Sequence, residues 1–125
     1  MGLFDSLLGN ATEVNLDELK QEFEPVLVDG EVIESAFQVF RDKWIFTNKR
    51  LILLDVMGVS GNKREYMSIP YGSILRFSIV TAGGFLDGDC EMKLWVKGMP
   101  EPMVKEFKKN IDIKGLQRTL ASYIL

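Results

Sequence analysis

The chain has 125 residues, of which 46% are hydrophobic and 26% charged, and a formal net charge of −3. These values are typical of one folded globular domain and exclude a disordered chain. The chain has no histidine, which removes the commonest general base and zinc ligand, and its single cysteine, Cys90, excludes an intramolecular disulfide. We therefore expect no catalytic site, no metal site and no cofactor.

Charge is distributed unevenly along the sequence. Residues 1–40 carry one basic and nine acidic side chains, a net charge of −8, whereas residues 41–125 carry fourteen basic and nine acidic ones, a net charge of +5. Opposite charges of this size favour attraction between the two regions, within one chain or between chains. The alternative is a solvated acidic helix ahead of a mildly basic domain, since surface ion pairs stabilise little.

Cellular location is predicted from three features of the sequence. No apolar run reaches the length of about 18 residues that a transmembrane helix needs. The first ten residues lack the basic segment of a signal peptide, and a single thiol suits a reducing compartment. We expect a cytoplasmic protein, with attachment to the inner face of the membrane as the alternative.

Residues 1–29 are predicted to form an N-terminal helical extension. Four apolar side chains at helical spacing form a stripe near the N-terminus, namely Leu3, Phe4, Leu7 and Leu8. A second helix is predicted to begin at Asn15, an N-cap with Glu18 as its capping-box partner, and to end at Pro25. We expect the stripe to pack on a neighbouring subunit. Membrane contact is the alternative, but Asp5 stands where a membrane helix usually carries Lys or Arg.

Residues 30–125 are predicted to form the main domain, with seven strands and a final helix. The strands are expected at residues 31–40, 44–47, 50–56, 64–69, 73–81, 90–97 and 103–108, separated by short turns. Alternation predicts that Leu75, Phe77 and Ile79 share one face of their strand. The tail then returns to helical spacing, with Asp112 as N-cap and an apolar stripe at Ile113, Leu116, Leu120 and Ile124.

This order of elements predicts an α+β fold, in which seven antiparallel strands form a sandwich or a partly open barrel. The final helix has an apolar stripe to bury, and the open end of such a barrel is the place expected for it.

Two strings in the central strands resemble the bacterial pleckstrin-homology (PH) domain family. They are WIFTNKRLILLD at residues 44–55 and SIPYGSI at residues 68–74. Similar features continue at Phe77-Ser78 and at residues 81–83, so the resemblance covers nearly the whole chain. It implies a PH-like fold with an added N-terminal helical segment and assembly into homo-oligomeric rings, pentamers being the expected form. It implies no catalytic residue.

One end of the predicted sheet is basic. Successive antiparallel strands reverse direction, so the connections after the first and third strands lie at the same end. Four cations are expected there: Arg41, Lys43, Lys63 and Arg64. They are candidates for binding an anion or an anionic lipid headgroup, although Asp42 and Glu65 are interleaved with them.

Three further motifs are assigned structural roles. The turn at residues 47–50 pairs an asparagine, which tolerates left-handed backbone, with solubilising cations, and ligand contact is the alternative. Asp87 and Asp89 begin like a calcium loop, but Gly98 stands at the twelfth position, where the loop needs a glutamate. The basic tail lacks interleaved aromatics, so no nucleic-acid partner is expected.

The sequence as a whole predicts a non-enzymatic oligomeric scaffold or protein-interaction module with an unidentified protein partner. Binding to anionic lipid is the alternative.

Overall fold

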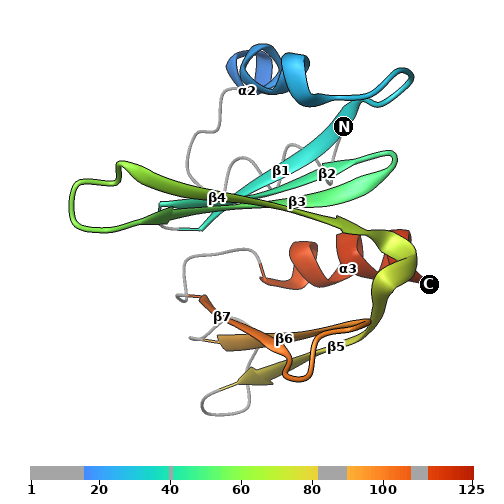
Figure 1. Cartoon of the computed structure of the whole chain (residues 1–125). Coiled ribbons are helices and arrows are strands. Elements are labelled where there is room, and N and C mark those ends of the chain that lie inside the picture. Colours follow the sequence, from blue (N-terminus) through green and yellow to red (C-terminus); the bar gives the residue numbers. More distant parts are fainter. Residues whose placement is uncertain (1–15, 40, 82–89, 108–112) are drawn as a thin grey trace. The chain divides into compact units, whose positions relative to one another are not determined.

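The computed structural model describes residues 16–39, 41–81, 90–107 and 113–125 (Figure 1). The chain divides into two compact units, one ending at Ser68 and the other beginning at Ile69. The predicted stripe near the N-terminus, the two predicted N-caps at Asn15 and Asp112, and the loop around Asp87 lie outside the described residues.

The first unit is a helix over a four-stranded sheet. Helix α2 (Leu16–Phe23) runs into a 3-10 turn η1 (Glu24–Val26), and four strands follow: β1 (Ile33–Val39), β2 (Asp42–Thr47), β3 (Arg50–Met57) and β4 (Lys63–Pro70, whose last two residues belong to the second unit). The strand order is β1-β2-β3-β4, and the β1–β2 and β2–β3 pairs are antiparallel. In Figure 1, α2 lies across one face of this sheet.

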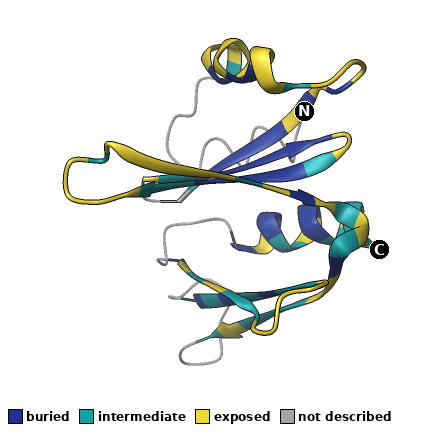
Figure 2. Ribbon diagram, in the orientation of Figure 1, coloured by how far each residue is buried: buried dark blue, intermediate teal, exposed yellow. Residues whose placement is uncertain are grey.

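The core of the first unit lies between α2 and the sheet. The helix contributes Leu19 and Phe23, one turn apart, and the sheet contributes the side chains that alternate onto the same face. The full cluster is Leu19, Phe23, Ile33, Ala36, Ile45, Ile52 and Leu54. Side chains of the opposite parity, Trp44 and Leu53 among them, are also buried. β2 and β3 therefore each contain an uninterrupted apolar run, at residues 44–46 and 51–54. Most of β4, by contrast, is exposed (Figure 2).

The second unit combines a three-stranded sheet with the final helix. A 3-10 turn η2 (Tyr71–Ser73) leads into β5 (Ile74–Thr81), β6 (Cys90–Val96) and β7 (Met103–Phe107), which form an antiparallel sheet in the order β5-β6-β7. Helix α3 (Ile113–Ile124) buries Ile113, Leu116 and Leu120, as its spacing predicts. Near its end, Tyr123 stacks on Tyr71 with ring centroids 4.6 Å apart, which fixes α3 against η2.

Three sequence-based details need correction. Leu75 is exposed because the β5–β6 register shifts between Ile74 and Arg76, and this bulge makes Ile74 the buried residue. The helix α2 ends at Phe23, before Pro25 as predicted, but the chain continues in a 3-10 turn, which accepts a proline in its first turn because proline has no N–H to bond. Finally, Asp42 and Lys43 belong to β2 instead of a connection, so the β1–β2 turn is tighter than predicted.

Candidate functional site

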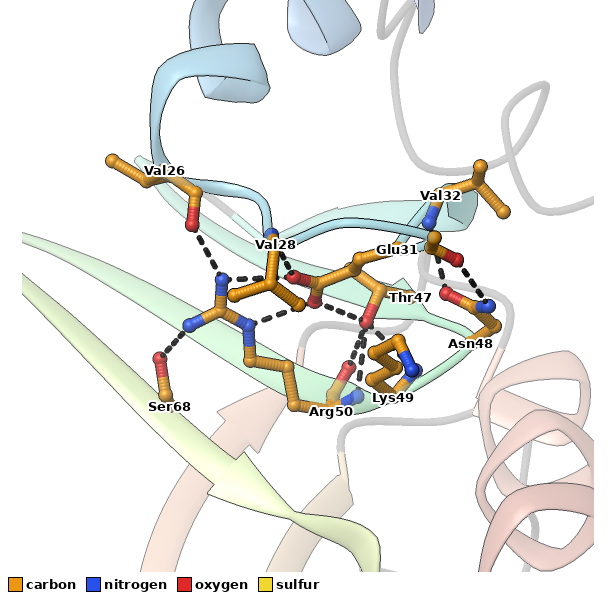
Figure 3. A network of polar contacts seen from close by, with 10 residues as sticks. Val26, Val28, Glu31, Val32, Thr47, Asn48, Lys49, Arg50 and Ser68 are labelled. Atoms are coloured by element: carbon orange, nitrogen blue, oxygen red, sulfur yellow. Dashed lines mark hydrogen bonds and ion pairs between the residues drawn. The ribbon is translucent and has the colours of Figure 1, made fainter.

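A buried carboxylate organises the polar centre of the first unit (Figure 3). Glu31 lies just before β1, and its side chain has no exposed surface. Oε2 accepts hydrogen bonds from Arg50 Nε at 2.8 Å and from Thr47 Oγ1 at 2.7 Å. Oε1 accepts from Arg50 Nη2 at 3.1 Å and from the Val28 amide at 3.0 Å. Four donors thus surround one carboxylate, which is the arrangement that a buried charge requires.

These contacts set the ionisation of Glu31. Burial alone raises the pKa of the carboxyl group, because it disfavours the charged form. The hydrogen bonds from Arg50, Val28 and Thr47, together with the charge of Arg50, act in the opposite direction and lower the pKa from its ordinary 4.5 to about 2. Glu31 is therefore charged at neutral pH and has no proton to donate as a general acid.

Arg50 extends the network from Glu31 to both sides. Nη2 also donates to the Val26 carbonyl at 2.8 Å, and Nη1 donates to Ser68 Oγ at 2.9 Å. One guanidinium therefore joins the segment after α2, the turn before β1 and strand β4. Figure 3 shows these groups converging on Arg50.

The β2–β3 turn completes the network. Thr47 Oγ1 accepts hydrogen bonds from the Lys49 and Arg50 amides, and Asn48 holds the neighbouring segment through the Gly30 carbonyl and the Val32 amide. Gly30 has a φ of 80°, a left-handed conformation that favours glycine. These bonds agree with a structural role for the turn, but Arg50 pairs with Glu31 instead of serving as a solubilising cation.

A pocket of about 210 Å³ opens beside this network. It lies between the end of α2 and strands β3 and β4, where β4 is left exposed. Its lining residues are Glu22, Phe23, Val26, Arg50, Ile52, Tyr66 and Ser68. Phe23 and Tyr66 meet edge to face, with ring centroids 5.9 Å apart. The pocket is mostly apolar, with hydroxyl and guanidinium groups at one side.

The four predicted anion-binding cations lie near one end of the four-stranded sheet. Arg41 Nη1 donates to the Gly58 carbonyl at 2.9 Å, so the β1–β2 and β3–β4 connections lie side by side, as expected. Strand alternation, however, places Arg64 on the face that carries Tyr66 and α2, and Lys63 on the opposite face. Lys63 and Arg64 therefore lie on opposite faces of β4, and anion binding by the four cations stays a prediction. The other predicted site, at Leu3, Phe4, Leu7 and Leu8, lies outside the described residues.

Sequence reasoning missed Glu31 and Ser68 as members of a polar site. Glu31 was expected to be an ordinary polar strand residue, and Ser68 a residue of the strand at 64–69 and of the family string at 68–74. Glu31 meets its partner Arg50 across 19 positions of sequence. No local spacing rule links residues so far apart, and the Asp29-Gly30 turn before Glu31 is the only nearby signal that its backbone is constrained.

Two kinds of feature are absent from the described part of the chain. Among those residues, no group of three or more acidic, histidine or cysteine side chains is placed to hold a metal ion. Likewise, neither described helix is long and apolar enough to cross a membrane.

Comparison with known proteins gives consistent results. The chain is 47% identical over 123 residues to YjqA of Bacillus subtilis (strain 168), a protein described as uncharacterized, and the match covers 98% of both chains. It is also similar to the crystal structure of a pleckstrin homology domain from Shewanella amazonensis SB2B, at 49% identity and a TM-score of 0.84, with 99% of each chain covered. A DUF1696 family protein with a pleckstrin-homology domain from Shewanella loihica PV-4 matches at 50% identity and a TM-score of 0.77, over 90% of this chain and 95% of that one.

These structures confirm the predicted PH-like fold, with seven antiparallel strands in two sheets and a helix at each end. The bacterial PH domain family model matches residues 2–124, nearly the whole chain. The resemblance seen in the strings at residues 44–55 and 68–74 is thereby confirmed, and the protein belongs to the bacterial PH domain family.

Proposed function

We propose that this protein is a non-enzymatic assembly module that binds copies of itself and a further protein partner. The main support comes from the outer strands of the three-stranded sheet. β5 exposes Leu75 and Val80, and β7 exposes Val104, at 59%, 50% and 48% of their surfaces. Each outer strand has one hydrogen-bonded neighbour within this sheet. Such edges, with apolar side chains beside them, favour pairing with a strand of another chain.

The buried polar groups support the non-enzymatic part of the proposal. Glu31 is charged and surrounded by donors, and the Thr47 hydroxyl bonds Glu31 and two backbone amides. Neither group is available as an acid or a nucleophile.

Light scattering coupled to size exclusion tests the assembly proposal at micromolar protein. We expect one oligomer of defined mass, with a closed ring of five subunits as the expected form. Val104→Lys should lower the mass, because it places a charge beside the edge strand. Val59→Lys is the matched control. Val59 is fully exposed in the β3–β4 connection, so this substitution should leave the mass unchanged.

Deleting residues 1–14 should also weaken assembly if the apolar stripe at Leu3, Phe4, Leu7 and Leu8 packs on a neighbouring subunit. A strict monomer would refute the proposal.

A second candidate function is attachment to an anionic membrane surface. Two apolar side chains are exposed at the end of β3: Val59, in the β3–β4 connection, completely, and Met57, the last residue of β3, by 41%. Arg41 is bonded to this connection, and Lys63 and Arg64 follow it. An apolar tip surrounded by cations suits a flat membrane, which does not require the cations to converge.

Co-sedimentation at low salt with vesicles of phosphatidylglycerol, compared with phosphatidylcholine, tests this function. Binding should need the anionic vesicles and should fall in the Lys63→Glu/Arg64→Glu variant and in Val59→Ser. Equal recovery with both vesicle types, or none with either, would exclude it.

A further inference from the structure

The pocket beside Arg50 has hydrogen-bond donors that no described residue accepts from. A guanidinium has five N–H groups. Arg50 directs one from Nε and one from Nη2 to Glu31, one from Nη2 to Val26 and one from Nη1 to Ser68. The second N–H of Nη1 has no acceptor among the described residues. Ser68 accepts from Arg50, and within the same set of residues its own hydroxyl proton has no acceptor.

The remaining walls of the pocket are mostly apolar. Phe23 and Tyr66 form an aromatic corner, Ile52 and Val26 add aliphatic surface, and Glu22 is the one further lining residue. A cavity of about 150 Å³ is sufficient to hold a benzene molecule, so about 210 Å³ accommodates one bulky apolar side chain. The pocket thus combines an apolar chamber with donors at one side, which is the pattern that a side chain and its neighbouring main-chain carbonyl complement.

The charges around the pocket argue against a carboxylate ligand. Arg50 is already paired with Glu31, and Glu22 adds a second carboxylate to the lining. The net charge of these three groups is negative, so a neutral carbonyl oxygen suits the free donors better than an anion does.

The surface around the pocket is also acidic on balance. The helical wall, α2 with η1, carries one exposed cation, Lys20, against four exposed acidic side chains, namely Asp17, Glu18, Glu22 and Glu24, and Arg64 on the face of Tyr66 adds one further cation. The apolar surface also continues out of the pocket, because Val26 and Val28 are each 58% exposed. The complementary partner is therefore basic and contacts an area larger than the pocket itself.

We propose that this pocket is a peptide-docking site. It takes one bulky apolar side chain from a basic segment of a partner protein, and the main-chain carbonyl of that segment accepts hydrogen bonds from Arg50 Nη1 and Ser68 Oγ. The inference rests on the proposed function as an interaction module and names the partner class. The docking proposal does not depend on the number of subunits. A monomeric mass in light scattering would therefore refute assembly alone, and an absence of peptide binding would refute docking alone.

Amide NMR spectra of the full-length, ¹⁵N-labelled protein test the proposal. The probe is the peptide acetyl-Lys-Lys-Phe-Lys-Lys-amide at millimolar concentration. It should shift the amides of Val26, Tyr66 and Ser68 in a saturable way. The matched peptides acetyl-Lys-Lys-Ala-Lys-Lys-amide and acetyl-Glu-Glu-Phe-Glu-Glu-amide should each bind at least about threefold more weakly, because one lacks the anchor and the other the complementary charge.

Protein variants separate docking in the pocket from general charge attraction. Val26→Lys, at the pocket wall, should abolish saturation, whereas Val59→Lys, which adds the same charge elsewhere, should retain it. Ser68→Ala should weaken binding through loss of a donor. The proposal is overturned if the alanine peptide binds as well as the phenylalanine peptide, or if Val26→Lys and Val59→Lys behave alike. It is also overturned if free N-acetylphenylalaninamide binds as tightly as the peptide, which would indicate a small-molecule site.

Discussion

Glu31 and Arg50 form a two-point ion pair between the turn that precedes β1 and the first residue of β3. Nε donates to Oε2 at 2.8 Å and Nη2 donates to Oε1 at 3.1 Å. The carboxylate is fully buried, and the guanidinium side chain is 24% exposed. Because Arg50 also bonds the Val26 carbonyl and Ser68, this pair joins the segment after α2 to the sheet.

Removing the charge of Glu31 should destabilise the protein. Glu31→Gln keeps the shape but weakens the bonds to Arg50 and leaves that cation without its counter-ion. We expect a loss of about 2–3 kcal/mol in the free energy of unfolding, below the value for a fully buried pair because Arg50 is partly in solvent. Urea unfolding measures it. The control Glu24→Gln changes an exposed carboxylate and should cost under about 0.5 kcal/mol. Equal effects of the two variants would contradict the structural role of the pair.

The same carboxylate makes stability depend on pH. Its pKa is about 2 in the folded state and 4.5 ordinarily, so the folded protein holds the charged form more strongly. This contribution, about 3 kcal/mol, is fully present above pH 4.5 and is lost as pH falls towards 2. Unfolding free energies measured from pH 6 to pH 2 should fall more steeply in the native protein than in Glu31→Gln. Parallel curves would show that Glu31 titrates normally.

The Thr47 hydroxyl should be needed as well as its methyl group. Thr47 is fully buried, and its oxygen bonds Glu31 and the Lys49 and Arg50 amides. Thr47→Val keeps the shape but removes one donor to Glu31 and the side-chain acceptor of the two amides, which should cost about 1–3 kcal/mol in unfolding free energy. Thr47→Ser keeps the hydroxyl and should lose less. If serine and valine destabilise equally in thermal unfolding, packing of the methyl group is the cause, not hydrogen bonding.

Gly30 should be sensitive to alanine for a backbone reason alone. Its φ is 80°, and a Cβ added there meets nothing within 4 Å, so crowding plays no part. Gly30→Ala should cost about 1–2 kcal/mol, the price of left-handed backbone for an L-residue. Gly72→Ala is the matched control, because Gly72 has equally open surroundings without a left-handed φ, and it should be neutral or slightly stabilising. Chemical denaturation of both variants compares them, and equal midpoints would refute the backbone explanation.

The apolar stripe of α3 should behave as core. Leu116 is fully buried, so Leu116→Ala should reduce the free energy of unfolding by about 2–5 kcal/mol. Lys114→Ala, two positions earlier and exposed, should change it by less than about 0.5 kcal/mol. Thermal unfolding monitored by circular dichroism measures both, and a small effect at Leu116 would mean that the helix is not anchored by its stripe.

The amino-acid sequence by itself determined the element order, the PH-like fold and most of the core. Period-two and period-3.6 patterns are local, so Leu116 and Leu120 in α3 and Met92 and Leu94 in β6 could be assigned to buried faces without a structure. The exposure of Leu75 could not be predicted, because a bulge depends on the pairing of β5 with β6. The tertiary structure alone decided that Glu31, Arg50 and Ser68 meet and that a pocket opens beside them. These residues come from distant segments, and an ion pair or a pocket exists only where folding brings such segments together.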